Sequence, residues 1–127
     1  MARLPGRDSR GQAAVEIALV MPVIVLLLLA AVQAGLVVRD QVLVVHAARE
    51  AARESAVRPG VDAPRRAAVA GSGLNARRLS VRLTGRGAAG SRVRAVVRYD
   101  SPTRVPIVGP LLPDVRLAGV ATMRVES

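Results

Sequence analysis

The feature that most constrains this chain is a run without any charged residue from Ile17 to Val38, which reads IALVMPVIVLLLLAAVQAGLVV. At 1.5 Å of rise per residue it forms roughly 33 Å of helix, enough to cross a bilayer core of about 30 Å. A helix buried in a soluble protein is seldom apolar on every face over such a length. The run therefore predicts one transmembrane helix, which leaves roughly 90 residues for a water-soluble part with one modest core.

Two features of the run bear on its packing. Pro22 falls in the first turns, where its missing backbone hydrogen bond costs least or produces a mild kink. Ala31 and Gly35 form a pair of small residues one turn apart, which lets two helices approach closely in lipid. The alternative is that these small residues only reflect an alanine-rich composition and pack against nothing.

A cleaved secretory signal is a rival interpretation of the same segment. Arginines precede the apolar run, and Val32-Gln33-Ala34 resembles a small-residue cleavage site. The apolar pattern, however, continues beyond Ala34 into a further helix and is longer than a usual signal core. We therefore favour a retained helix, and keep a secreted small binding protein that begins at Gly35 as the alternative.

Glu16 stands directly before the uncharged run. At the N-terminus of a helix its carboxylate is favoured by about 0.3–1 kcal/mol by the helix dipole. Near the centre of a membrane helix a charged residue costs about 2.5–3.5 kcal/mol on insertion scales. On these grounds alone Glu16 is an interfacial residue beside the lipid headgroups.

The surroundings of Glu16 add a second interpretation. A short basic leader, Gly11, four residues, Glu16 and an apolar helix follow one another, and this layout resembles the type IV pilin-like class. In detail, RGQAAVEIALVMPVIVLLLLAAVQAG resembles the N-terminus of TadE-like pseudopilins of the Tad (tight adherence, Flp pilus) system. The segments AAREAARESAV after the membrane and ATMRVE near the C-terminus are also similar to that family.

The resemblance implies a processing step. In that family a prepilin peptidase cuts after the glycine on the cytoplasmic side, so the expected cut lies between Gly11 and Gln12. The new amine at Gln12 then lies within reach of lipid, and Glu16 of a neighbouring subunit neutralises it. Two buried charges are tolerated when they pair, whereas one alone is not.

The resemblance also implies an organisation and partners. We expect a basic leader peptide over residues 1–11, a transmembrane helix over 12–38 and an extracytoplasmic α+β domain over 39–127, with the N-terminus cytoplasmic. The arginines that flank the run do not decide the orientation by themselves. The implied partners are membrane lipid, other Tad/Flp pilus subunits with a TadF-like protein, and the prepilin peptidase. The expected role is a minor pilin-like component of a hetero-oligomeric assembly; an unprocessed single-pass anchor of another envelope complex is a further alternative.

The chain after the membrane continues as a helix from Asp40 to Val57. A smooth stripe of alanines recurs at helical spacing and predicts packing on a sheet, or on another helix of an assembly: Ala47, Ala48, Ala51 and Ala52. Arg58-Pro59-Gly60 ends this helix. A short second helix is expected over Pro64–Ala70, with Asp62 as its cap and Gly71 as its stop.

Three strands follow, each alternating apolar with polar residues as an antiparallel sheet with one wet face requires. The predicted inward residues are Leu79, Val81, Leu83, Val93, Ala95, Val97, Tyr99, Val115, Leu117, Ala121 and Val125. A turn over Gly85–Gly90 joins the first two strands. A loop with four prolines joins the last two, as a plain connector or a docking loop. The expected fold is α+β, pilin-like: a long N-terminal helix continuing into a helix packed on a small antiparallel sheet.

Composition excludes several functions. Without cysteine the chain has no disulfide, cysteine zinc site or thiol nucleophile. His46 is the single histidine, so no His cluster for a metal or for a serine nucleophile is expected. We predict no enzyme, no cofactor and no metal. The net charge is +10, but Tyr99 is the one aromatic residue, which disfavours nucleic acid; an arginine-rich face instead suits anionic headgroups.

Overall fold

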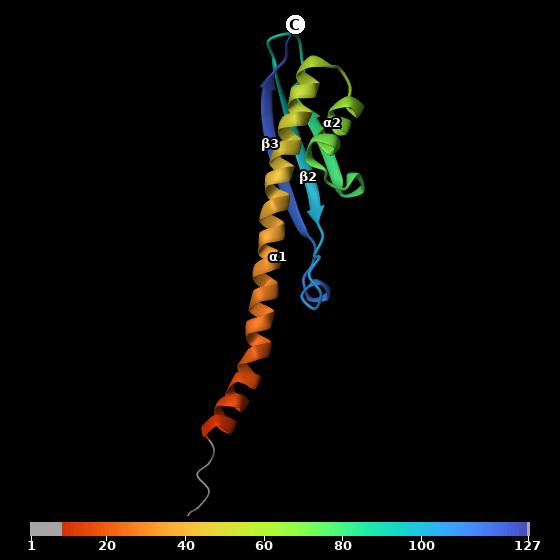
Figure 1. Cartoon of the computed structure of the whole chain (residues 1–127). Helices are drawn as coiled ribbons and strands as arrows, with labels where there is room; N and C mark the ends of the chain where they lie inside the picture. The colour runs from red at the N-terminus through yellow and green to blue at the C-terminus, as the bar shows by residue number, and fades with distance from the viewer. Residues whose placement is uncertain (1–8, 127) are drawn as a thin grey trace, which may run out of the picture.

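The computed structural model describes residues 9–126, and the first eight residues of the expected leader lie outside this range. Helix α1, Ser9–Val57, is uninterrupted (Figure 1). It bends in its first third, the part that contains Pro22. Every residue of α1 up to Leu28 is exposed, whereas its C-terminal half packs against the rest of the chain. The predicted continuation of the apolar helix into Asp40–Val57 is therefore confirmed.

The C-terminal half of α1 belongs to a small domain, and the α+β fold class is confirmed. The remaining elements are α2 (Asp62–Ser72), the 3-10 turn η1 (Ala76–Arg78), β1 (Leu79–Thr84), β2 (Arg92–Ser101), the 3-10 turn η2 (Gly109–Leu111) and β3 (Val115–Arg124). The strands form an antiparallel sheet in the order β1-β2-β3. Val97 of the central strand pairs with Val81 on one side and with Gly119 on the other.

The alanine stripe of α1 forms the centre of the core. Ala47, Ala48, Ala51 and Ala52 are completely buried, in one cluster with residues of β2 and with Ala68 of α2. The predicted packing of this stripe on the sheet is confirmed, and α2 completes the cover. Small side chains on α1 bring the helix close to the sheet, so that the core is thin and built from short contacts.

The closest approach between helix and sheet is at Gly119 of β3. A Cβ atom added there would lie 2.9 Å from the carbonyl oxygen of Val44 and 3.0 Å from the Cα of Val45. Both are backbone atoms of α1 and cannot turn aside. Any side chain at position 119 would therefore push α1 away from β3.

The predicted ends of α2 are wrong by two residues on each side. Asp62 lies inside the first turn and not at the cap, which is Val61 without a side-chain hydrogen bond. At the other end the helix continues through Gly71. A Cβ atom added there would lie 3.0 Å from the Cγ of Glu50, so the glycine leaves room for that side chain. The helix stops at Gly73, which adopts the left-handed φ of 69° that favours glycine.

The alternation of the strands is largely as predicted. β2 alternates exposed arginines with buried Val93, Ala95, Val97 and Tyr99. In β3, Val115 is 39% exposed, contrary to prediction, because it occupies the last position of the β2–β3 ladder, opposite Ser101. The loop between β2 and β3 extends from the sheet along α1 towards its N-terminal end (Figure 1).

Candidate functional site

The residues of the predicted processing motif lie in the first turns of α1. Gly11, Gln12 and Glu16 are all exposed. The backbone N–H groups of the first four helical residues have no helical acceptor, so the Gly11–Gln12 bond lies where the helix unwinds most easily. Gln12 and Glu16 are four residues apart and therefore share one side of the helix.

The predicted helix-packing pair is open. Ala31 and Gly35 are exposed, and a Cβ atom added at Gly35 would meet nothing within 4 Å. This part of α1 is half-buried or buried on another side, at Leu29, Gln33 and Asp40. At about 100° of rotation per residue, the small pair lies roughly opposite that covered side. The structure does not bring this pair together with the motif at Gly11.

The N-terminal half of α1 has the properties of a membrane anchor. Within the described chain, α1 is the one helix long and apolar enough to cross a membrane, and none of its most apolar 18-residue window is buried. An apolar surface of this size without protein cover marks a membrane or protein contact. The helix fits a single-pass membrane anchor.

Four polar residues form a buried contact that the sequence did not predict. We call Gln33, Asp40, Ser101 and Arg104 the Asp40 cluster. The hydroxyl of Ser101 donates to Oδ2 of Asp40 over 2.7 Å, and Nη2 of Arg104 donates to the same oxygen over 3.2 Å. Nη1 of Arg104 lies 3.5 Å from Oδ1 of Asp40, and the backbone N–H of Arg104 donates to Oε1 of Gln33 over 3.3 Å.

The Asp40 cluster ties the loop between β2 and β3 to the end of the apolar helix. The side chain of Asp40 is only 1% exposed, so its charge depends on the guanidinium of Arg104 and the hydroxyl of Ser101. One sequence signal could have indicated part of the Asp40 cluster: Gln33 and Asp40 are seven residues apart, which places both on one face of the helix. Nothing local pointed to Arg104 as their partner.

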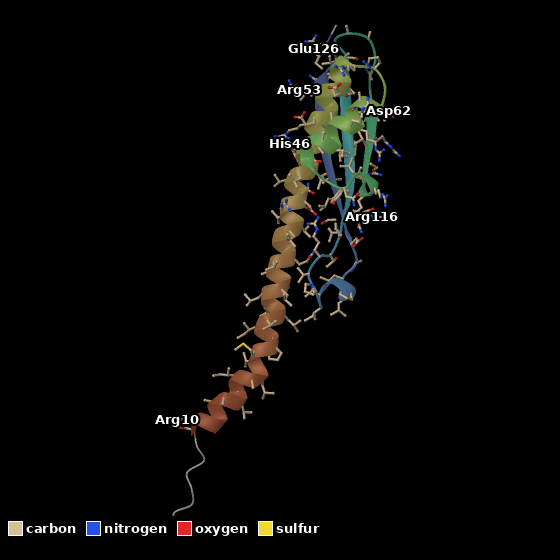
Figure 2. The ribbon with its side chains drawn as sticks, turned by 45° about the vertical axis from the view of Figure 1, so that its right-hand side comes forward. Arg10, His46, Arg53, Asp62, Arg116 and Glu126 are labelled. Carbon is tan, nitrogen blue, oxygen red and sulfur yellow. The ribbon has the colours of Figure 1, made fainter. Side chains whose placement is uncertain are left out.

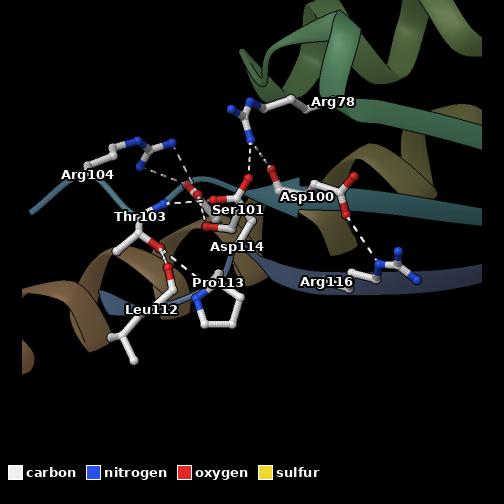
Figure 3. A network of polar contacts seen from close by, with 10 residues as sticks. Arg78, Asp100, Ser101, Thr103, Arg104, Leu112, Pro113, Asp114 and Arg116 are labelled. Atoms are coloured by element: carbon white, nitrogen blue, oxygen red, sulfur yellow. Dashed lines mark hydrogen bonds and ion pairs between the residues drawn. The ribbon is translucent and has the colours of Figure 1, made fainter. Parts of the chain in front are cut away.

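The two ends of the same loop are joined by further charges (Figure 3). Nη1 of Arg78 donates to Oδ2 of Asp114 over 2.9 Å, and the backbone N–H of Thr103 lies 3.4 Å from Oδ1 of Asp114. The hydrogen bond from Arg78, helped by that from Thr103, lowers the pKa of Asp114 below its ordinary value of 3.8. Arg116 and Asp100 approach to 3.9 Å nearby.

Within residues 9–126 no three His, Cys, Asp or Glu side chains are placed to hold a metal ion. His46 is exposed on the side of α1 away from the sheet (Figure 2). The open face of the sheet carries exposed arginines, as the alternation predicted: Arg82, Arg92, Arg94, Arg98, Arg116 and Arg124.

A helix that is apolar and exposed at one end, and packed on a small α+β domain at the other, fits a domain carried on a single-pass membrane anchor. The family model of TadE-like proteins matches residues 11–53, so the predicted resemblance to that family is confirmed over this segment. TadE-like proteins are a structural pilus-assembly family and not an enzyme family, and the similarity of this chain to them covers residues 11–53. The similar segment ATMRVE lies outside the match. No curated protein and no solved structure matches the chain.

Proposed function

We propose that this protein is a minor pilin-like component of a Tad/Flp pilus assembly or secretion system. Its N-terminus faces the cytoplasm and its α+β domain lies outside. A prepilin peptidase cuts between Gly11 and Gln12, and the new amine of Gln12 pairs with Glu16 of a neighbouring subunit. The protein acts by inserting its helix among other Tad/Flp subunits, with a TadF-like protein as a partner.

The observation that carries this proposal is the coincidence of the matched segment with α1. Residues 11–53 begin at Gly11 and end among the alanines that pack on the sheet. A single uninterrupted helix therefore joins the motif to the domain.

The Asp40 cluster supports a retained helix over a cleaved signal. A cut after Ala34 would remove Gln33, whose side-chain oxygen accepts the hydrogen bond from the backbone of Arg104. A cut after Gly11 leaves that contact intact. The geometry thus favours a mature chain that keeps its apolar segment.

The experiment is to determine the N-terminus of the protein purified from its native membranes, by intact mass and sequencing. Two matched variants separate the possibilities: Gly11→Leu blocks a cut after residue 11, and Ala34→Leu blocks a cut after residue 34. We expect a start at Gln12 in the native protein and in Ala34→Leu, and an uncut chain in Gly11→Leu. A start at Gly35 would make the protein a secreted one, and an uncut native chain would make it an unprocessed anchor.

A further inference from the structure

The loop between β2 and β3 carries an exposed apolar tip. Ile107, Leu111 and Leu112 are 62%, 76% and 48% exposed, and we call these three residues the loop tip. The segment from Val105 to Pro113 reads VPIVGPLLP and contains no charged or polar side chain. Three large exposed apolar side chains on one short loop of a small domain call for a partner.

Most backbone N–H groups of this loop donate to carbonyls within the loop. Over residues 106–113 three prolines have no N–H to satisfy. The N–H groups of Val108, Gly109, Leu111 and Leu112 all donate to carbonyls inside the loop, over 2.8–3.4 Å. A segment in contact with lipid must satisfy its polar backbone internally, because hydrocarbon offers no partners. Four of the five N–H groups of this segment meet that requirement; the exception is Ile107, which has a positive φ of 72°.

The position of the loop places its tip beside the membrane segment. The Asp40 cluster fixes Arg104 next to Gln33, and Gln33 lies five residues inside the uncharged run that ends at Val38, or roughly 8 Å along the helix axis. The loop then extends further in the direction of the N-terminal end of α1 (Figure 1). Leu29, one turn before Gln33, is half-buried.

Charges surround the base of the loop and are missing from its tip. Arg104 pairs with Asp40, Arg78 with Asp114, and Arg116 approaches Asp100 (Figure 3). An apolar tip with a band of arginine–carboxylate pairs behind it matches the order of layers in a bilayer, where the hydrocarbon lies beneath the polar headgroups.

We propose that the loop tip inserts into the outer part of the bilayer beside α1, so that the domain is held at the membrane by two contacts. The apolar loop surface continues the lipid-facing surface of α1, and the hydrogen bonds of the Asp40 cluster hold the loop against the helix. This inference rests on the proposed membrane anchoring by α1. The second contact fixes the tilt of α1 and of the domain that it carries, because a single helix can tilt in the bilayer.

The test uses the absence of cysteine from the chain. Single-cysteine variants of the full chain, Leu111→Cys at the loop tip, Leu26→Cys in the span and Ala89→Cys in the β1–β2 turn, are labelled with an environment-sensitive dye. Each is reconstituted, at about one copy per vesicle, into vesicles of phosphatidylethanolamine and phosphatidylglycerol. We expect blue-shifted emission and several-fold stronger quenching by spin-labelled lipid at positions 111 and 26, with water-like emission at position 89.

Each other outcome has one meaning. If the dye reports lipid at position 26 but water at position 111, the loop inference is wrong and the membrane anchor stands. Both dyes in water overturn the anchoring itself. Emission at position 111 that shifts only when many copies share a vesicle, without lipid quenching, assigns the loop tip to a second copy of the chain and also overturns the proposal. A second test places the dye at Pro110→Cys, with and without replacement of all three loop-tip residues by Ser. The triple replacement is expected to abolish the lipid quenching of this dye.

Discussion

Asp40 is a carboxylate buried at the end of an apolar helix, and its charge is balanced from a loop. Arg104 supplies two N–H groups and Ser101 a hydroxyl, so the oxygens of Asp40 that water can no longer reach are both in contact with donors. Hydrogen bonds to charged groups contribute about 1.5–3 kcal/mol, and the loss falls mainly on the partner left behind. The folded domain therefore depends on Arg104 more than on any arginine of the open sheet face.

Replacement of Arg104 by Ala is expected to lower the free energy of unfolding by about 1.5–3 kcal/mol. Urea unfolding of the full chain in detergent micelles measures it, with Tyr99 as the sole aromatic reporter. Arg98→Ala on the exposed sheet face is the matched control and is expected to change stability by no more than about 0.5 kcal/mol. Equal losses in the two variants would contradict a special role for the Asp40 cluster.

Asp114 gives a prediction about pH. Because Arg78 lowers its pKa in the folded chain, the ionised carboxylate stabilises the fold at every pH above the ordinary value of 3.8. This contribution is lost as the pH falls below 3.8 and through the lowered folded value. The stability advantage of the native chain over Asp114→Asn should then be constant near neutral pH and vanish in strong acid. An advantage that persists unchanged in strong acid would show that the charge is not its source.

At the scale of elements, the contact between α1 and β3 depends on one missing side chain. Gly119→Ala puts a methyl group 2.9 Å from the carbonyl oxygen of Val44, closer than real Cβ contacts allow. Because only backbone lies opposite, the helix and the strand must separate, and overpacking of this kind costs about 1–3 kcal/mol.

The matched control is the same substitution on the open side of α1. Gly35→Ala meets nothing within 4 Å and replaces a helical glycine, so stability is expected to stay level or to rise by up to about 1 kcal/mol. Thermal unfolding of both variants in the same micelles, followed by circular dichroism, compares them directly. A Gly119→Ala domain as stable as the native one would mean that α1 and β3 have room to adjust.

At the scale of the whole molecule, the membrane half of α1 has two different sides. One side, at Gln33 and Asp40, is covered by the loop, and roughly opposite lies the small pair Ala31 and Gly35. The covered side holds the domain in place, which leaves the small pair as the side open to another helix of an assembly.

Under the proposed function, Gly35→Ile is therefore expected to reduce the recovery of Tad pilus components with this protein from native membranes several-fold, without altering the fold of its own domain. The bulk of isoleucine prevents close approach of a second helix. Val25→Ile, which enlarges an exposed side chain on a different side of α1, is the control and should leave recovery unchanged. Equal recovery with both variants would assign the helix contact to another face.

Local patterns in the sequence were sufficient to predict most of the fold. The uncharged run, the alanine stripe and the alternation of β2 each repeat with the period of one element, so near neighbours alone determine them. For the same reason the resemblance to TadE-like proteins, confirmed over residues 11–53, could be recognised from adjacent residues. The roles of Gly11, Gln12, Glu16, Ala31 and Gly35 stay predictions, because each requires a partner outside this chain.

Tertiary structure alone decided the contacts between distant segments. Arg104 and Asp40 are 64 residues apart, and no periodic signal links a proline-rich loop to the end of a helix. Gly119 and the continuation of α2 through Gly71 likewise depend on how closely α1 is approached, which is a property of packed surfaces and not of the local chain. Sequence patterns determined which elements form, because hydrophobic periodicity is local. The spacing of the elements and the contacts between distant segments follow from close packing in three dimensions.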